Sequence, residues 1–271
     1  MMFGCLPSKT DIRDYKICSA ANPSITYPEK FSLEDLPKVK QQGSVNSCCA
    51  HATSSILEYH DKNAHKLSTN FIYGIQKKLF NQTQQGMYLS QACKIVQKYG
   101  DFLEVDCRGN NEIPTCYSIA ENALTKESAT KEAYEYRIDS YYLCPTDNDI
   151  KLALMNYGPV LCAIDWYNTF TLDKDYIINF DKKSDHGGHA VVCVGWDDTK
   201  KSWLIQNSWG SAWGKKGLFY LPYEHGFYEA RALVDHPNAE NDTTLKVPNK
   251  NLPRFLAKII NFFINLFKKK N

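Results

Sequence analysis

Four residues have side chains whose types and order suit nucleophilic catalysis. Cys48 can supply a thiolate, and a thiolate nucleophile requires an imidazole partner, which His189 offers about 140 residues later. The side-chain carbonyl of Asn207 can accept a hydrogen bond from the other ring nitrogen and so hold one tautomer. Gln42 precedes Cys48 by six residues. Each residue alone is weak evidence, because a cysteine in a helix usually packs in a core, but together they indicate a thiol enzyme.

The local sequence places these residues at the ends of predicted elements. Asn46 and Ser47 are good helix N-caps, and apolar residues recur through CCAHATSSILEYH, so a helix is predicted to begin near Cys48. A thiol there lies at the positive end of the helix dipole, which favours the thiolate. His189 heads the β-like run HAVVCVGW, and Asn207 lies in the run SWLIQNSW.

The predicted secondary structure changes from helical to β-like near residue 130. Helical patterns start at Asn46 and at Ser90, where a serine cap is predicted to open a helix that ends at Gly100. Short β-like runs follow, at residues 134–143, 159–164, 189–196, 202–209 and 217–221. Helices followed by antiparallel strands predict an α+β fold with two lobes, although these patterns also leave a single mixed domain open.

The composition excludes several classes of protein. Of 271 residues, 43% are hydrophobic and 23% charged, which excludes a disordered chain, a collagen-like fibre and a multi-pass membrane protein. The formal net charge of +2 gives no indication of a basic surface that would bind nucleic acid, so no nucleic-acid partner is expected. The opening sequence MMFGCLPSKTDIRDYKIC lacks the apolar run of a secretory signal. We therefore expect an intracellular protein in a reducing compartment, where structural disulfides are rare.

The ten cysteines include no CxxC pair, which argues against a zinc ribbon or a thioredoxin-like motif. Cys162 and Cys193 lie in apolar β-like runs and Cys93 in a helical pattern, so all three are predicted to be buried core thiols. Cys107 and Cys116 flank a loop. A disulfide between them is the alternative if the protein is exported.

The C-terminal segment has its own pattern. A polar linker over 237–251 precedes PRFLAKIINFFINLFKKKN at 252–271, whose polar residues fall on one stripe of a predicted helix. The apolar stretch 255–267 would span about 20 Å, short of a bilayer core of about 30 Å. The segment is basic, so the rest of the chain is mildly acidic. Binding to a membrane surface, to a partner protein or back onto the domain all fit this amphipathic helix.

With these motifs in place, the chain resembles the papain-like cysteine peptidases. The resemblance rests on QQGSVNSCCAHA around Cys48, GGHAVVCVGW around His189 and WLIQNSWGSAWGKKGLFYL around Asn207, and it covers about residues 30–235. The last segment is the most specific, because NSWG-x-x-WG after a β-run is hard to obtain by accident. QQGMYLSQACKIVQKYG and LMNYGPVLCAI are weaker matches.

The resemblance implies a two-lobed fold with the active-site cleft between the lobes. The helical lobe would occupy about 31–130 and an antiparallel, β-barrel-like lobe about 131–236, together forming the catalytic domain 31–236. Residues 1–30, called the leader below, would be extended.

The resemblance also implies roles for individual residues. Cys48 would be the nucleophile, His189 the general acid and base, and Asn207 the residue that orients the imidazole. Gln42 would donate to the oxyanion beside the backbone N–H of Cys48, and Trp209 would shield the His189–Asn207 hydrogen bond from water. The implied activity is hydrolysis of protein or peptide substrates through an acyl-enzyme, without a cofactor or a metal. Other residues would line the substrate groove, namely Gly86, Met87, Tyr88, Gly188 and Ala190. Their character favours an apolar substrate side chain at the second position before the cut.

The chain departs from the family pattern beside the nucleophile. Cys49 stands where the family usually has tryptophan, Val45 where a disulfide cysteine is common, and Asn46 where a glycine lies by the groove. Successive helical residues diverge by about 100°, so Cys48 and Cys49 cannot both face His189. The spacing from the glutamine selects Cys48, and Cys49 is predicted to be core, with a vicinal disulfide as an alternative.

Regulation and activity each leave alternatives open. The leader is too short for the family's usual inhibitory propeptide of about 60–100 residues, so control by another route is expected, with the DIRDY segment as a candidate. A catalytically inactive papain-fold binding module, tethered by its tail, is the first rival to a peptidase. A transglutaminase-like acyl transferase is the second, and the NSWG segment argues against it. Asp185 and His186 near His189 are too few ligands for a metal site.

Overall fold

The structure, a computed structural model, describes residues 4–9, 11, 14–17, 25–81, 85–104 and 132–235. The chain divides into one compact unit that ends at His236 and a second unit, Pro237–Asn271. The predicted linker and basic tail helix lie outside the described residues, as do Cys107 and Cys116.

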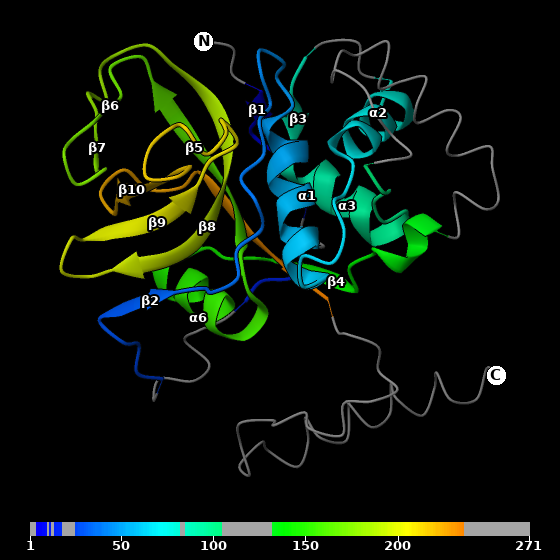
Figure 1. The fold of residues 1–271 in the computed structure, drawn as a ribbon, viewed down its shortest axis with the longest axis horizontal. Helices are drawn as coiled ribbons and strands as arrows, with labels where there is room; N and C mark the ends of the chain where they lie inside the picture. The colour runs from blue at the N-terminus through cyan, green and yellow to red at the C-terminus, as the bar shows by residue number, and fades with distance from the viewer. Residues whose placement is uncertain are drawn as a thin grey trace. The chain divides into compact units, whose positions relative to one another are not determined.

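Three helices from the first half of the chain pack together (Figure 1). They are α1 (Cys48–His60), α2 (Thr69–Leu79) and α3 (Leu89–Lys98). Ile56, Ile72 and Ile95, one from each helix, are at most 1% exposed in a common core. A further helix, α6 (Asp147–Tyr157), packs with the later part of the chain.

The later part of the chain forms a seven-stranded sheet in which all pairs are antiparallel (Figure 1). The strand order is β10–β9–β8–β5–β11–β4, and β2 also pairs with β8. The strands are β2 (Lys30–Ser32), β4 (Ser140–Leu143), β5 (Val160–Tyr167), β8 (His186–Asp197), β9 (Ser202–Gln206), β10 (Leu218–Pro222) and β11 (Glu229–Val234). Two small pairs complete the described strands: β1 (Cys5–Leu6) runs parallel to β3 (Met87–Tyr88), and β6 (Thr171–Leu172) antiparallel to β7 (Ile178–Asn179).

Both faces of the sheet are buried, which explains why its central strands are apolar over most of their length. On β5, Leu161 and Ala163 join the core of the three helices, whereas Cys162 and Ile164 face the second core of the sheet. The side chains of a strand alternate between faces, so each central strand contributes to both cores. The helices and the sheet thus form the predicted α+β fold.

The predicted strands near 160, 190, 203 and 219 are present, each within a few residues of the expected bounds. The run 134–143 was only partly correct, because residues 132–135 are helical and the strand starts at Ser140. Tyr88, not Ser90, caps α3. The sequence patterns did not predict α6, although its capping box of Thr146 and Asp149 is a recognisable helix start.

Candidate active site

Cys48 is the first residue of α1, and its thiol faces the sheet. The Sγ atom accepts a hydrogen bond of 3.4 Å from the backbone N–H of Ala190 on β8. Ser47 occupies the N-cap position without a side-chain capping bond, and its hydroxyl instead contacts His51. The free N–H groups of the first turn therefore leave a positive electrostatic potential near the thiol.

The surroundings of Cys48 stabilise its thiolate. Burial alone would raise the pKa of this thiol, since its side chain is 0% exposed. Hydrogen bonds with the Cys49 thiol and the His189 ring, the charge of His189 and the N–H of Ala190 outweigh burial and hold the pKa of Cys48 well below its usual range. A low pKa is the property that a cysteine nucleophile needs.

His189 and Asn207 come from neighbouring strands of the sheet. His189 lies on β8 opposite Ile164, and Asn207 directly follows β9. The Nε2 atom of His189 lies 2.8 Å from the Oδ1 atom of Asn207, and this oxygen also accepts from the N–H of Ser208 at 2.8 Å. Because Oδ1 can only accept, Nε2 is the protonated ring nitrogen, and Nδ1 is left for Cys48.

A group of aromatic rings surrounds the imidazole. The ring centroids of Trp166 and Trp209 each lie 5.2 Å from that of His189, at interplanar angles of 82° and 35°. These two indoles are 4.6 Å apart and border an apolar cavity of about 600 Å³. The aromatic walls lower the local dielectric around the His189–Asn207 hydrogen bond and thereby strengthen it.

The segment before the nucleophile is fixed to the segment that carries the asparagine. The backbone N–H of Gln42 donates to the carbonyl of Ser208 at 2.9 Å, and the Ser208 hydroxyl donates to the side-chain oxygen of Gln42 at 2.5 Å. The side-chain nitrogen of Gln42 donates to the carbonyl of Val45 at 3.0 Å. Gln42 is therefore oriented at both ends of its amide, and one N–H of that amide stays available.

The leader covers the predicted substrate groove. The Gly4 carbonyl accepts from the N–H of Met87 at 2.8 Å, and Leu6 lies opposite Tyr88 in the β1–β3 pair. The Cys5 carbonyl lies so close to Gly188 that no Cβ would fit there. The side chain of Leu6 also approaches Gly86. Ala190, which is also predicted to line the groove, donates its backbone N–H to the Cys48 thiol.

Cys49 is buried, as predicted, but it faces the leader. Its Sγ atom lies 3.2 Å from the carbonyl oxygen of Met87 and 3.9 Å from that of Gly4. Burial, together with hydrogen bonds to Cys48 and Cys5, raises the pKa of the Cys49 thiol well above its usual range. The pKa values of the two adjacent thiols are therefore shifted in opposite directions, and of the two only Cys48 has a stabilised thiolate.

The sequence patterns did not indicate several residues that neighbour the site. Trp166 stands in an ordinary β-run, and Tyr228, whose hydroxyl donates to the Cys5 carbonyl at 3.4 Å, has no motif around it. Ser208 could have been found, because it belongs to the NSWG segment. Asn46, which replaces a family glycine, packs its carbonyl against Gly4.

The other predicted cysteines and charged groups lie away from the site. Cys93, Cys162 and Cys193 are 0% exposed, free thiols within the cores. Within the described ranges, no group of three or more His, Cys, Asp or Glu side chains is arranged to hold a metal ion. Among those same residues, no helix has the length and apolarity to cross a membrane.

Comparisons with known proteins identify the family of this chain. Residues 28–231 match the family described as papain family cysteine protease. An uncharacterised peptidase C1-like protein of Acanthamoeba polyphaga mimivirus is 26% identical over 265 residues, which cover 82% of each chain. A cathepsin B-like cysteine proteinase of Schistosoma japonicum is 36% identical over 118 residues, 40% of this chain and 34% of that one.

Solved structures show the same fold. Xylellain, a cysteine protease from Xylella fastidiosa, superimposes with a TM-score of 0.73 at 25% identity, over 87% of this chain and 96% of that chain. The procathepsin B S9 of Trypanosoma congolense has a TM-score of 0.66 at 17% identity, over 87% of each chain, and supports the fold alone.

Proposed function

Because this chain belongs to the papain family of cysteine proteases, we propose that it is a thiol endopeptidase in which Cys48 attacks the substrate and His189 transfers protons. The observation that carries this proposal is the hydrogen bond from His189 to Asn207 beside a thiol of lowered pKa. That arrangement stabilises an imidazolium–thiolate pair, the reactive form of such a nucleophile.

The reaction would proceed by acyl transfer. The Cys48 thiolate attacks the peptide carbonyl, and the His189 imidazolium protonates the departing amine. Neutral His189 then activates a water molecule, which releases the acyl-enzyme. Asn207 keeps Nε2 protonated throughout, so that Nδ1 is the atom that exchanges protons with thiol, amine and water.

The oxyanion would be held by the Gln42 amide and the backbone N–H of Cys48. The hydrogen bonds that Gln42 makes with Val45 and Ser208 support this role, because they fix the amide before substrate arrives. A pre-oriented donor of this kind typically lowers the barrier by about 3 kcal/mol.

An epoxide or vinyl-sulfone probe that labels thiol peptidases tests the proposal. We expect the wild-type chain to be labelled at Cys48 and the Cys48→Ala variant to stay unlabelled. Cys49→Ala serves as the matched control, because the neighbouring thiol is not expected to react. A folded wild-type protein that takes no label even after removal of the leader would refute the peptidase.

One observation favours a second candidate, a binding module without hydrolysis. Cys48 is 0% exposed and the leader fills the groove, so this conformation admits no substrate. If labelled enzyme cleaved no member of a diverse peptide library, the non-hydrolytic module would be favoured.

The contact of Leu6 with Gly86 supports an apolar preference in the groove. We propose that the substrate residue second before the cut is apolar and lies by Met87, which is 0% exposed. Cleavage profiling on a peptide library checks this preference, and selection of a charged residue at that position would contradict it.

The proposed role of the tail rests on the sequence. We propose that the protein is intracellular and that residues 252–271 bind a membrane surface or a partner protein, since the stripe pattern is amphipathic and basic. Co-sedimentation with liposomes should depend on this segment. A full-length chain that stays in the supernatant would exclude the membrane.

A further inference from the structure

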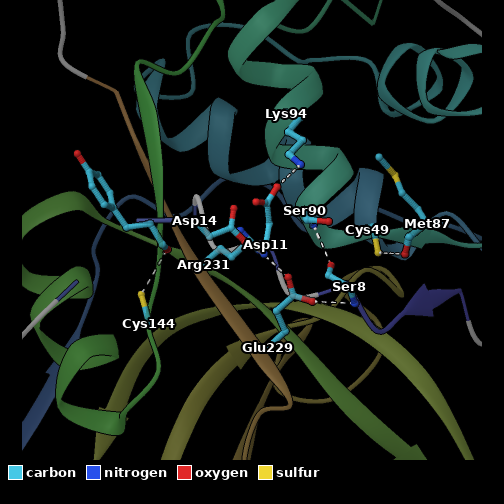
Figure 2. Close-up of polar contacts among 11 residues, drawn as sticks. Ser8, Asp11, Asp14, Cys49, Met87, Ser90, Lys94, Cys144, Glu229 and Arg231 are labelled. Carbon is cyan, nitrogen blue, oxygen red and sulfur yellow. Dashed lines mark hydrogen bonds and ion pairs between the residues drawn. The ribbon is translucent and has the colours of Figure 1, made fainter. Parts of the chain in front are cut away.

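The leader is attached to both the helices and the sheet (Figure 2). The N–H of Ser8 donates to a carboxylate oxygen of Glu229 at 3.3 Å, and the Ser8 hydroxyl accepts from the N–H of Ser90 at 3.2 Å. Asp14 forms an ion pair of 2.8 Å with Arg231, and both side chains are at most 5% exposed. The leader thus bridges α3 and β11, and its seated position is specific.

Seating the leader brings three thiols together. Cys5 on β1 is 3% exposed and lies in the same buried core as Cys48 and Cys49. The Cys49 Sγ atom lies 3.2 Å from the carbonyl oxygen of Met87, the residue with which Cys5 is paired. The Cys49 Sγ atom approaches the Gly4 carbonyl as well, which places it under the leader backbone.

We propose that Cys5 and Cys49 form a redox-controlled disulfide that locks the leader over Cys48, with a small disulfide such as oxidised glutathione as the oxidant. The lock requires no large movement of the backbone, because Cys5 is paired with Met87 and the Cys49 Sγ atom lies 3.2 Å from the Met87 carbonyl. Under reducing conditions only non-covalent contacts hold the leader, and the groove can open.

The nucleophile starts the oxidation when the leader lifts. The Cys48 thiolate attacks one sulfur of oxidised glutathione, the sulfur–sulfur bond breaks, and one glutathione thiolate leaves. Cys5, as a thiolate on the lifted leader, then attacks the Cys48 sulfur and displaces the second glutathione. The protons of Cys5 and Cys49 finally reside on the two glutathione thiols.

A last exchange moves the bond to its resting place. The Cys49 thiolate attacks the Cys5 sulfur, and Cys48 leaves as a thiolate. The thiol of lowest pKa leaves fastest, and among the three that thiol is Cys48, whereas the pKa values of Cys5 and Cys49 are raised chiefly by burial. Two protein thiols are oxidised and one glutathione disulfide is reduced, while the nucleophile ends unmodified beneath the leader.

This lock rests on the proposed function only in using Cys48 as the attacking thiol. Its consequence is a reversible block: reduction of one disulfide returns an intact nucleophile. If glutathione stayed on Cys48 instead, it would occupy the groove and keep the leader lifted. The Cys48 sulfur would then be less protected than beneath the seated leader.

Disulfide mapping of the full-length chain tests the proposal. The protein is incubated with oxidised glutathione, alkylated, digested without reduction and analysed by mass spectrometry. We expect a Cys5–Cys49 peptide without attached glutathione. Alkylation of Cys48 by iodoacetamide should slow about tenfold or more and recover with dithiothreitol.

Variants separate the lock from general oxidation. Cys5→Ser and Cys5→Ala should retain glutathione on Cys48, because the resolving thiol is missing. Cys144→Ser, which removes a buried thiol outside the cluster, should form the same Cys5–Cys49 bond as wild type. Wild-type protein in which Cys5 stays free, pairs elsewhere or leaves glutathione on Cys48 would overturn the lock. Disulfide mapping needs no substrate. If the Cys5–Cys49 disulfide forms in a chain that cleaves no peptide, the proposed peptidase activity is refuted and the lock is not.

Discussion

At the scale of single residues, one position separates a thiol of lowered pKa from a thiol of raised pKa. Cys48 and Cys49 share the same helix turn, yet the first accepts a backbone N–H from Ala190 while the second faces the carbonyl of Met87. Against the effect of burial, hydrogen bonds with Cys49 and His189 and the charge of His189 hold the pKa of Cys48 low, whereas burial raises the pKa of Cys49.

The lowered pKa of Cys48 predicts how its reactivity depends on pH. A thiol whose pKa is lowered remains a thiolate as the pH falls below the usual thiol range, and it loses reactivity only when the pH drops through its own lowered pKa. The rate of iodoacetamide labelling in leader-free protein should therefore persist at acidic pH. In His189→Ala the inflection should move to higher pH, since a hydrogen bond and a charge are lost. An inflection at the same pH in His189→Ala and in wild type would contradict the pairing of Cys48 with His189.

Asn207 tests the orientation of the imidazole. In Asn207→Ala the His189 ring loses its 2.8 Å partner, so kcat should fall about a hundredfold through misplacement of the proton carrier, with little change in KM. Steady-state kinetics on a peptide substrate measure this split. Asn207→Asp retains an acceptor and should be less impaired, and equal losses in both variants would argue against orientation.

At the scale of elements, the start of α1 and the neighbouring strands β8 and β9 position the candidate catalytic groups, and the leader lies over them. The backbone pairing of Gln42 with Ser208 joins the loop before α1 to the end of β9, so nucleophile and asparagine share one rigid frame. The leader is held by side chains from two other elements, among which the pair of Asp14 and Arg231 is the most buried.

The buried pair predicts how the leader is released. In Asp14→Asn the leader loses its contact to Arg231, which keeps Glu229 as a partner at 2.5 Å, so the fold should survive while the leader lifts more often. Probe labelling of Cys48 should accelerate about tenfold.

Asp11→Asn is the matched control for the leader. Asp11 pairs with Lys94 at 3.4 Å, with side chains 21% and 43% exposed, and exposed pairs contribute little. Its labelling rate should stay near that of wild type. If both variants behaved alike, the buried ion pair would not be what seats the leader.

At the scale of the whole molecule, the sheet carries two cores, and the helices depend on one of its faces. Leu161 of β5 is fully buried in the core that also contains α1, α2 and α3. The same strand supplies Cys162 to the opposite core. Loss of packing on one strand is therefore felt on both sides of the sheet.

Leu161→Ala should lower the free energy of unfolding by about 2–5 kcal/mol, because it leaves a cavity between sheet and helices. Chemical denaturation measures the change. Leu79→Ala, at a side chain 44% exposed, is the control and should change stability by less than about 1 kcal/mol. Similar losses at both positions would show that the shared core is not the main support.

Local sequence patterns were sufficient to predict a cysteine peptidase of the papain family and most of the sheet. One such pattern is the order of Gln42, Cys48, His189 and Asn207. The other is the set of alternating or continuous apolar runs, which follow from the geometry of helices and strands. They were enough to predict the α+β fold and the positions of four β-runs, but not α2, α6 or β11.

The place of the leader and the contacts of its cysteine depend instead on the packing of the folded chain. Cys5 reaches Cys49 through backbone pairing of β1 with β3, and Asp14 reaches Arg231 across more than 200 residues of chain. Such contacts have no period in the sequence, because they arise from the packing of whole elements rather than from the repeat of one. In the sequence Cys5 is one thiol among ten, and the fold places it beside the nucleophile's neighbour.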